Sequence, residues 1–116
     1  MNIAKIKTYN CPVEAAMNVI GGKYKARIIY ELISGTKRYN EIQKALPQAT
    51  PRMLSKQLKE LEDDGVIKRV LYPIVPPKTE YSLTEMGITL VPIMEALCKW
   101  GEHYFKLAGI SITHDE

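Results

Sequence analysis

The chain has 116 residues, of which 46% are hydrophobic and 25% are charged, as in an ordinary water-soluble globular protein. It shows no secretory signal, and no apolar run approaches the about 20 residues that cross a bilayer. Two cysteines cannot build the disulfide framework of a small secreted protein. We therefore expect one domain over residues 1–116, with its core over residues 11–106, in a reducing cytoplasm and without membrane contact.

The net charge of +3 is unevenly distributed along the chain. Residues 1–83 contain 14 Lys and Arg against 8 Asp and Glu, or +6, whereas residues 84–116 contain 2 against 5, or −3. A basic body with an acidic C-terminal segment indicates that the body faces a polyanion. Random variation of charge along a short chain is the alternative explanation.

Two helices are predicted in the first third of the chain. Pro12, directly after Cys11, suits the first position of a helix because its missing N–H would have had no partner there. The apolar stripe of this helix consists of Val13, Ala16, Met17 and Ile20. Gly21-Gly22 ends it, and the second helix runs from about Lys23 to Ser34. The predicted buried face of the second helix consists of Tyr24, Ile28, Ile29 and Leu32.

A short helix, a tight turn and a longer helix follow. The short helix covers about Tyr39 to Leu46, and residues 47–49 form the turn. Thr50 is a good N-cap and Pro51 a good first residue for the next helix. The core stripe of that helix consists of Leu54, Leu58 and Leu61. This order of elements is that of a helix-turn-helix unit.

The sequence then changes to the pattern of a β-hairpin. Residues 66–72 mix β-branched, aromatic and charged residues, as a half-buried strand does. The proline-rich residues 73–77 cannot lie inside a strand and are predicted to form the turn, and residues 79–83 form the returning strand. A bihelical unit followed by such a hairpin predicts a mostly helical α+β fold, the winged helix-turn-helix.

Thr84 is predicted to cap a last long helix that runs to about Ala108 and bends near Pro92. Its apolar residues are too many for a single stripe: Leu90, Val91, Ile93, Met94, Leu97, Cys98, Trp100, Tyr104, Phe105 and Leu107. One face can pack on the domain, and the rest would be exposed unless a partner covers it. We therefore expect a homodimer with twofold symmetry.

The second helix of the helix-turn-helix unit carries its basic residues on one outward line, Arg52, Lys56 and Lys59. Its acidic residues crowd the C-terminal end, which is the reverse of what the helix dipole favours. This polarity is expected of a helix whose N-terminal half enters a DNA major groove. A solvated charged face is the alternative. In a homodimer, two such helices about 34 Å apart would read an inverted repeat.

We predict the following contacts to double-stranded DNA. The residues of the major-groove helix are Thr50, Arg52, Met53, Ser55, Lys56 and Lys59. The hairpin adds Arg69 and Lys78, and the segment before the short helix adds Lys37 and Arg38 as phosphate contacts. Alternatively, Lys37 and Arg38 are solvated loop charges, and the hairpin prolines serve to prevent edge-strand aggregation.

The two cysteines differ in their predicted surroundings. Cys11 lies at the N-cap of the first helix, where the helix dipole favours the reactive thiolate and Glu14 opposes it. It is a candidate redox sensor or, alternatively, a small buried cap residue. Cys98 is predicted to pack in the core or at the dimer interface. His103 and His114 have no metal-ligand spacing, and no catalytic motif is present, so we expect no enzyme, cofactor or metal.

Several segments together resemble the HxlR-type regulators, and they follow in that family's order over about residues 11–101. The segments are Cys11-Pro12-Val13-Glu14, residues 20–25 (IGGKYK), 38–42 (RYNEI), 52–65 (RMLSKQLKELEDDG) and 72–84 (YPIVPPKTEYSLT), and Trp100-Gly101. Tyr24 stands where the family usually has tryptophan, which we interpret as an aromatic exchange in the core.

The resemblance implies a bacterial or archaeal dimeric winged-helix regulator, related to the MarR group and associated with the nucleoid. It implies that the first and last helices build the dimer and that the helix with Arg52, Ser55 and Lys56 reads the major groove. In several members the cysteine matching Cys11 senses oxidants, quinones or other electrophiles. The second sensing cysteine of some members is absent here. The alternative functions are a winged-helix protein-interaction module without specific DNA binding, and a sensor whose main output is a dimer rearrangement.

Overall fold

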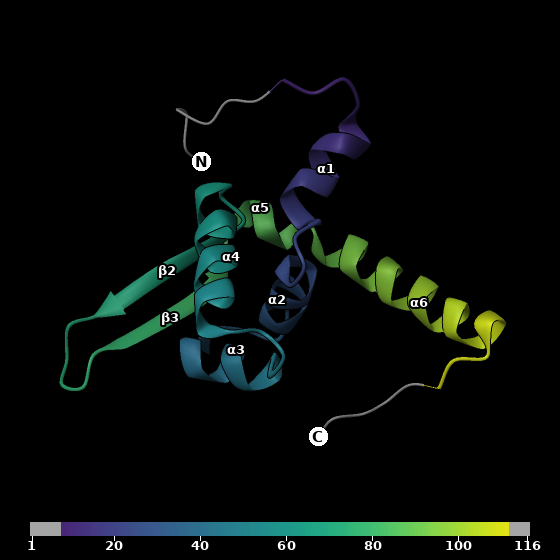
Figure 1. Ribbon diagram of the computed structural model, residues 1–116. Coiled ribbons are helices and arrows are strands. Elements are labelled where there is room, and N and C mark those ends of the chain that lie inside the picture. Colours follow the sequence, from purple (N-terminus) through teal and green to yellow (C-terminus); the bar gives the residue numbers. More distant parts are fainter. Residues whose placement is uncertain (1–7, 112–116) are drawn as a thin grey trace.

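The computed structural model describes residues 8–111, and Figure 1 shows a hairpin and a long helix that project from a group of shorter helices. The elements in chain order are α1 (Pro12–Ile20), α2 (Lys25–Leu32), β1 (Lys37–Arg38), α3 (Tyr39–Ala45), α4 (Pro51–Asp63), β2 (Ile67–Tyr72), β3 (Lys78–Leu83), α5 (Glu85–Ile88) and α6 (Val91–Ala108). The winged-helix order predicted from the sequence is confirmed. His114 and the two ends of the predicted domain, residues 1–7 and 112–116, lie outside the described residues.

Local chemistry explains where α4 starts and stops. The Thr50 Oγ1 accepts a hydrogen bond from the Met53 backbone N–H at 3.1 Å, so the predicted N-cap is confirmed. Pro51 follows in the first turn, where its missing N–H costs nothing. Gly65 lies just past the end of the helix with φ 78°, the left-handed conformation that glycine adopts most readily. These signals set the length of α4 and turn the chain directly into β2.

The three strands form one antiparallel sheet in the order β1-β3-β2. The β2–β3 pairing runs from Ile67↔Leu83 to Tyr72↔Lys78, and this hairpin is the wing. β1 pairs only Lys37↔Tyr81 and Arg38↔Glu80. Sequence reasoning missed β1 because two charged residues carry no alternating pattern, and only the tertiary pairing with β3 makes them a strand.

The core lies between α2, α3, α4 and the base of the sheet. Its fully buried side chains are Ile28, Ile29, Ile42, Leu54, Leu58, Leu61, Val66 and Ile67. The predicted inward faces of α2 and α4 are therefore confirmed, except that Tyr24 precedes α2 and is only half-buried. Two polar residues, Lys25 and Gln57, are also buried, and neither was predicted to be.

The long C-terminal helix is divided, which corrects the prediction of one bent helix. Thr84 caps the short helix α5, accepting a hydrogen bond from the Gly87 N–H at 3.1 Å. Gly87 is buried at a close approach, since a Cβ there would lie 2.1 Å from the Val66 carbonyl oxygen. The chain then turns at residues 89–90, and Pro92 occupies the first turn of α6. Pro92 thus helps to start a helix and does not bend one.

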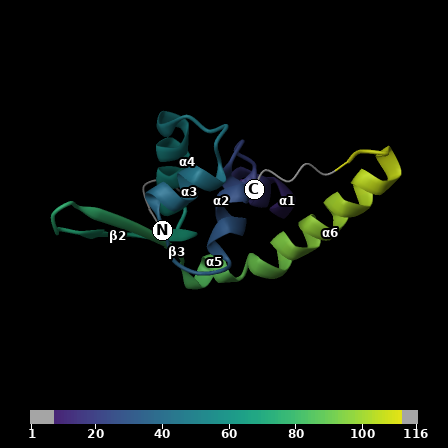
Figure 2. The same ribbon diagram turned by 90° about the horizontal axis from the view of Figure 1, so that it is seen from below.

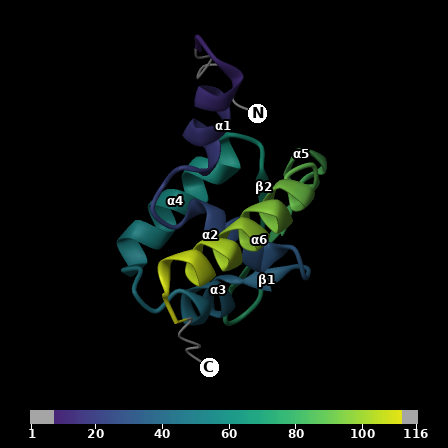
Figure 3. The ribbon, with the colours of Figure 1, turned by 90° about the vertical axis from the view of Figure 1, so that its right-hand side faces the viewer.

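The helices at the two ends of the chain stand apart from this core. α6 crosses α2, and α1 extends beyond the end of α2 (Figure 3). The C-terminal half of α6 leaves the body on the side opposite to the wing (Figure 2). Ile20 is the buried residue of α1, and Met94 that of α6. None of the helices in residues 8–111 combines the length and hydropathy that a bilayer crossing needs.

Candidate nucleic-acid interface

The outward face of α4 presents the predicted major-groove residues. Leu54, Leu58 and Leu61 point into the core, and the opposite side chains of Arg52, Lys56 and Lys59 are exposed. Ser55 is exposed beside them, whereas Thr50 uses its hydroxyl as the helix cap. Met53 is half-buried, and its sulfur lies 3.5 Å from the Gln57 side-chain amide. Helical spacing therefore places the three basic residues as predicted.

Tyr39, a residue that sequence reasoning did not assign to the site, lies against the first turns of α4. Its hydroxyl is 3.4 Å from the Ser55 Oγ and 3.4 Å from the Pro51 carbonyl oxygen. The Ser55 hydroxyl is therefore held toward the α3 side of the helix. A tyrosine at the start of a short helix indicates only that its ring packs in the core. In the structure the Tyr39 ring is half-buried, and its hydroxyl reaches the surface beside α4.

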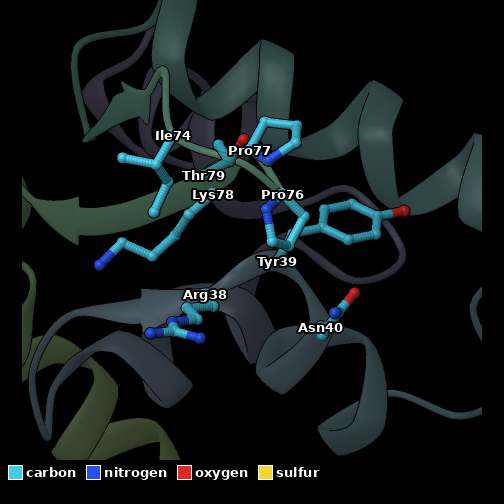
Figure 4. A pocket seen from close by; sticks show the side chains of 8 residues that line it. All are labelled: Arg38, Tyr39, Asn40, Ile74, Pro76, Pro77, Lys78 and Thr79. Atoms are coloured by element: carbon cyan, nitrogen blue, oxygen red, sulfur yellow. The ribbon is translucent and has the colours of Figure 1, made fainter.

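A cleft of about 530 Å³ separates the start of α3 from the tip of the wing. Its lining residues are Arg38, Tyr39, Asn40, Ile74, Pro76, Pro77, Lys78 and Thr79. Figure 4 shows Arg38 and Asn40 on one side of this cleft and Pro76 and Lys78 on the other. The pairing of β1 with β3 brings Arg38 to the wing, so two cations predicted independently of each other line one concave surface.

A second cleft, of about 310 Å³, lies between α4 and the base of the wing. It is lined by Ser55, Lys59, Glu62, Arg69 and Tyr81. Burial raises the pKa of the Tyr81 hydroxyl, which therefore remains a neutral hydrogen-bonding group at physiological pH. The first cleft lies beside α3 and the second beside α4, and together they are lined by five of the ten predicted DNA-contacting residues: Arg38, Ser55, Lys59, Arg69 and Lys78.

The basic residues of this surface fall into two groups. In the first group, each cation has a carboxylate beside it. Lys59 lies 3.2 Å from Asp63, Arg69 lies 4.0 Å from Glu62, and Lys78 lies 3.6 Å from Glu80. Arg52 and Lys56, in the N-terminal half of α4, have no carboxylate partner among residues 8–111. The strongest unneutralised positive charge of α4 is thus at the helix end predicted to enter the groove.

Lys78 is also held by an aromatic ring. Its ammonium lies 4.5 Å from the centre of the Tyr72 ring, across the β2–β3 pairing. The Tyr72 hydroxyl donates a hydrogen bond to the Glu80 carboxylate. This hydrogen bond raises the pKa of the hydroxyl because it stabilises the protonated form. Near the wing, Lys37 is half-buried in β1, and the Arg38 backbone N–H donates to the Glu41 carboxylate at 2.9 Å.

The HxlR-like helix-turn-helix family model matches residues 19–108, nearly the whole described chain. The chain belongs to this family. The resemblance stated from the sequence is therefore confirmed, and the chain is a transcription regulator of the helix-turn-helix type and not an enzyme.

Relatives of this HxlR-like chain support the same assignment. It is 55% identical over 94 residues to YdeP, an HTH-type transcriptional regulator of Bacillus subtilis (strain 168), covering 81% of this chain and 73% of YdeP. The reduced form of the redox regulator HypR is 48% identical, with a TM-score of 0.81 over 85% of this chain and 98% of HypR. The reduced form of the transcriptional regulator YodB from B. subtilis is 33% identical, with a TM-score of 0.70 over 83% and 95% of the two chains.

Both cysteines of this HxlR-like chain are free and exposed. Cys11 is the N-cap of α1 but its side chain makes no capping hydrogen bond, so the alternative of a buried cap residue is wrong. Cys98 is not a core residue either: its Sγ lies 3.6 Å from a Glu102 carboxylate oxygen. An electrostatic interaction with the neighbouring Cys98 side chain, and a hydrogen bond to it, raise the pKa of Tyr30 on α2. No cluster of His, Cys, Asp and Glu in residues 8–111 is arranged to hold a metal ion.

Proposed function

We propose that this HxlR-like regulator binds DNA sequence-specifically as a homodimer, with one α4 helix in each of two major grooves of an inverted repeat. The observation that carries the proposal is the outward face of α4. Arg52, Ser55 and Lys56 are exposed there, on the half of the helix whose cations have no carboxylate partner in the described part of the chain. A helix N-terminus with free Arg and Lys side chains is suited to phosphates and base edges.

The roles of the individual residues follow from their chemistry. Arg52 can form two parallel hydrogen bonds to the O6 and N7 of a guanine, whereas Ser55 accepts or donates to either kind of base. Lys37, Arg38, Arg69 and Lys78 contact phosphates on both sides of the groove, and these contacts hold the protein on the duplex without reading sequence. The two clefts beside the wing would then follow the sugar-phosphate backbone.

The homodimer is supported by the apolar stripe of α6. This stripe consists of Ile93, Leu97, Trp100, Tyr104 and Leu107, which recur at alternating spacings of four and three residues. All five side chains are exposed, Trp100 at 64% and Leu107 at 76%. Val13 of α1 is likewise 68% exposed. A second copy of the chain would bury these surfaces, and twofold symmetry would place two α4 helices for an inverted repeat.

A thiol response through Cys11 is the second part of the proposal. Cys11 is exposed at the N-terminus of α1, and α1 is one of the two proposed dimer helices. A similar protein, HypR, is a redox regulator known in reduced and oxidised forms. Since the second sensing cysteine of some family members is absent, Cys11 would respond by alkylation, by a mixed disulfide or by pairing with its copy across the dimer.

One titration tests both the DNA binding and the thiol response. The purified protein is titrated against the DNA that flanks its own gene, at two salt concentrations, with and without a thiol-reactive quinone. Tight, competitor-resistant binding that the quinone abolishes is expected. Tight binding that the quinone leaves unchanged keeps the regulator and removes Cys11 as a sensor. Weak, competitor-sensitive binding favours the protein-interaction module instead. Its dissociation constant would be about 10⁻⁴–10⁻⁶ M, as is typical of nonspecific DNA binding.

A further inference from the structure

A polar cluster, buried at Lys25 and Gln57 and partly exposed at Glu60, ties α4 to the junction between α1 and α2. Lys25, the first residue of α2, is only 6% exposed, and its ammonium lies 3.0 Å from a carboxylate oxygen of Glu60. One residue earlier, the Tyr24 backbone N–H donates to the side-chain oxygen of Gln57 at 2.7 Å. Gln57 is buried as well. Two side chains of α4 therefore bind two consecutive residues of the same junction.

Stability alone is a poor explanation for Lys25. A cation in the first turn of a helix opposes the helix dipole, and burying a charge costs more than its ion pair commonly returns. Apolar residues of similar size are often neutral or stabilising in such places. An ion pair of this kind is of more use for fixing one geometry than for holding the fold together.

The junction itself is shaped around the Lys25 side chain. A Cβ on Gly22 would lie 2.8 Å from the Cδ and 2.9 Å from the Cγ carbon of Lys25, closer than real Cβ contacts allow. Gly22 directly follows α1 and its C-cap. The segment that follows α1 thus lies against the aliphatic part of the lysine whose ammonium reaches α4.

The cluster occupies one flank of α4. At about 100° per residue, Gln57 and Glu60 lie about 60° apart, between the exposed Arg52 and Lys56 on one side and the buried leucines on the other. The opposite flank is held by Tyr39, whose hydroxyl lies 3.4 Å from the Ser55 Oγ. Contacts on both flanks resist rotation of α4 about its own axis, which the leucine stripe alone resists less well.

We propose that Lys25, Gln57 and Glu60 are positioning residues that set the rotation of α4 relative to α1, and with it the direction in which Arg52 and Lys56 point. The inference rests on the proposed function, because it takes α4 as the helix that reads DNA. In a dimer built on α1, the cluster connects the interface directly to both reading helices. It therefore controls discrimination between sequences, while the nonspecific attraction to phosphates does not depend on it.

α2 offers a matched control for a test. Arg27 and Glu31 form a second ion pair, also at 3.0 Å, but both partners belong to α2 and the arginine is exposed. Lys25→Met and Glu60→Gln therefore break the pair that reaches α4, and Arg27→Met and Glu31→Gln remove the same charges without touching α4. Each variant is titrated against the duplex that the wild type selects from a random pool and against an unrelated duplex, and its unfolding temperature is measured.

We expect Lys25→Met and Glu60→Gln to weaken binding of the selected duplex about tenfold relative to their controls, with unchanged binding of the unrelated duplex. Lys25→Arg, which keeps the charge, should restore most of the discrimination. Equal losses on both duplexes, or equal effects of the two ion pairs, overturn the positioning role. Glu60 is partly exposed, so Glu60→Gln tests the idea even where Lys25→Met fails to fold. A wild type that selects no duplex contradicts the proposed function itself, before any substitution is made.

Discussion

The α4–wing side of the molecule and the α1–α6 side differ in the chemistry of their outward faces. On the first side, apolar residues of α4 are buried and the outward face is polar and cationic. On the second, the outward faces are apolar, as at Trp100 and Val13. The wing and α6 leave the body in opposite directions (Figure 2). One surface is thus chemically suited to a polyanion, and the other lacks the polar covering that a monomer normally has.

The largest expected effect on DNA affinity comes from a substitution in the apolar stripe of α6. Leu97→Asp places a charge in the middle of the apolar stripe, so a dimer that buries this residue should dissociate, and affinity for the operator should fall by about 100-fold or more. Sedimentation equilibrium measures the association. Lys99→Asp, on a part of α6 that faces neither the stripe nor the body, changes the charge by more and should leave the dimer intact. Equal behaviour of the two variants would place the dimer interface elsewhere.

The next effect concerns base reading on α4. Arg52→Ala should weaken operator binding by about 1–3 kcal/mol and relax the preference at one base pair of each half-site. Competition titrations with single-base operator variants measure this. Arg27→Ala removes an exposed arginine from α2 and serves as the control. If Arg52→Ala leaves affinity and base preference unchanged, Arg52 does not read sequence.

A smaller and more uniform effect is expected at the wing. Lys78→Ala should weaken all duplexes alike and reduce the slope of log K against log salt by about 1, because one phosphate contact is lost. The loss is moderated by Glu80, which already neutralises part of the Lys78 charge in the free protein. Binding measured over a range of salt concentrations checks it. A loss confined to one operator sequence would instead make Lys78 a base contact.

The smallest effect on affinity is expected at Cys11. Cys11→Ser should leave DNA binding unchanged in reducing buffer, because the side chain makes no capping hydrogen bond, but should abolish the response to a quinone. Cys98→Ser is the control and should respond as the wild type does. DNA binding before and after quinone treatment gives both results. A quinone response that survives in Cys11→Ser but not in Cys98→Ser would transfer the sensor to α6.

Much of the fold was predictable because local signals agree with the tertiary structure. Thr50 and Pro51 start α4 where the sequence places it, and the spacing of its leucines gives the buried face. The same spacing gives the exposed line of Arg52, Lys56 and Lys59. These features depend on residues a few positions apart, which is the range over which a sequence pattern carries information.

The features that were missed depend on contacts between distant residues. β1 exists only through its pairing with β3, and α5 packs at Gly87 against the Val66 carbonyl oxygen, a contact between residues 21 positions apart. Tyr39 lies beside Ser55 because the turn between α3 and α4 brings the two helices together. Lys25 resembles any surface lysine in the sequence, and only the fold places it under Glu60. The carboxylates beside Arg69 and Lys78 are likewise visible only in three dimensions.

Selection of duplexes by the wild-type protein from a random-sequence pool tests sequence-specific binding most directly. We expect an inverted repeat whose half-sites are centred about 10–10.5 bp apart, the distance between two major grooves on one face of DNA. The same selection with Arg52→Ala should lose the preference at one position in each half-site. A pool that stays random after repeated selection, while the protein still binds DNA in a salt-dependent manner, would contradict sequence-specific reading by α4.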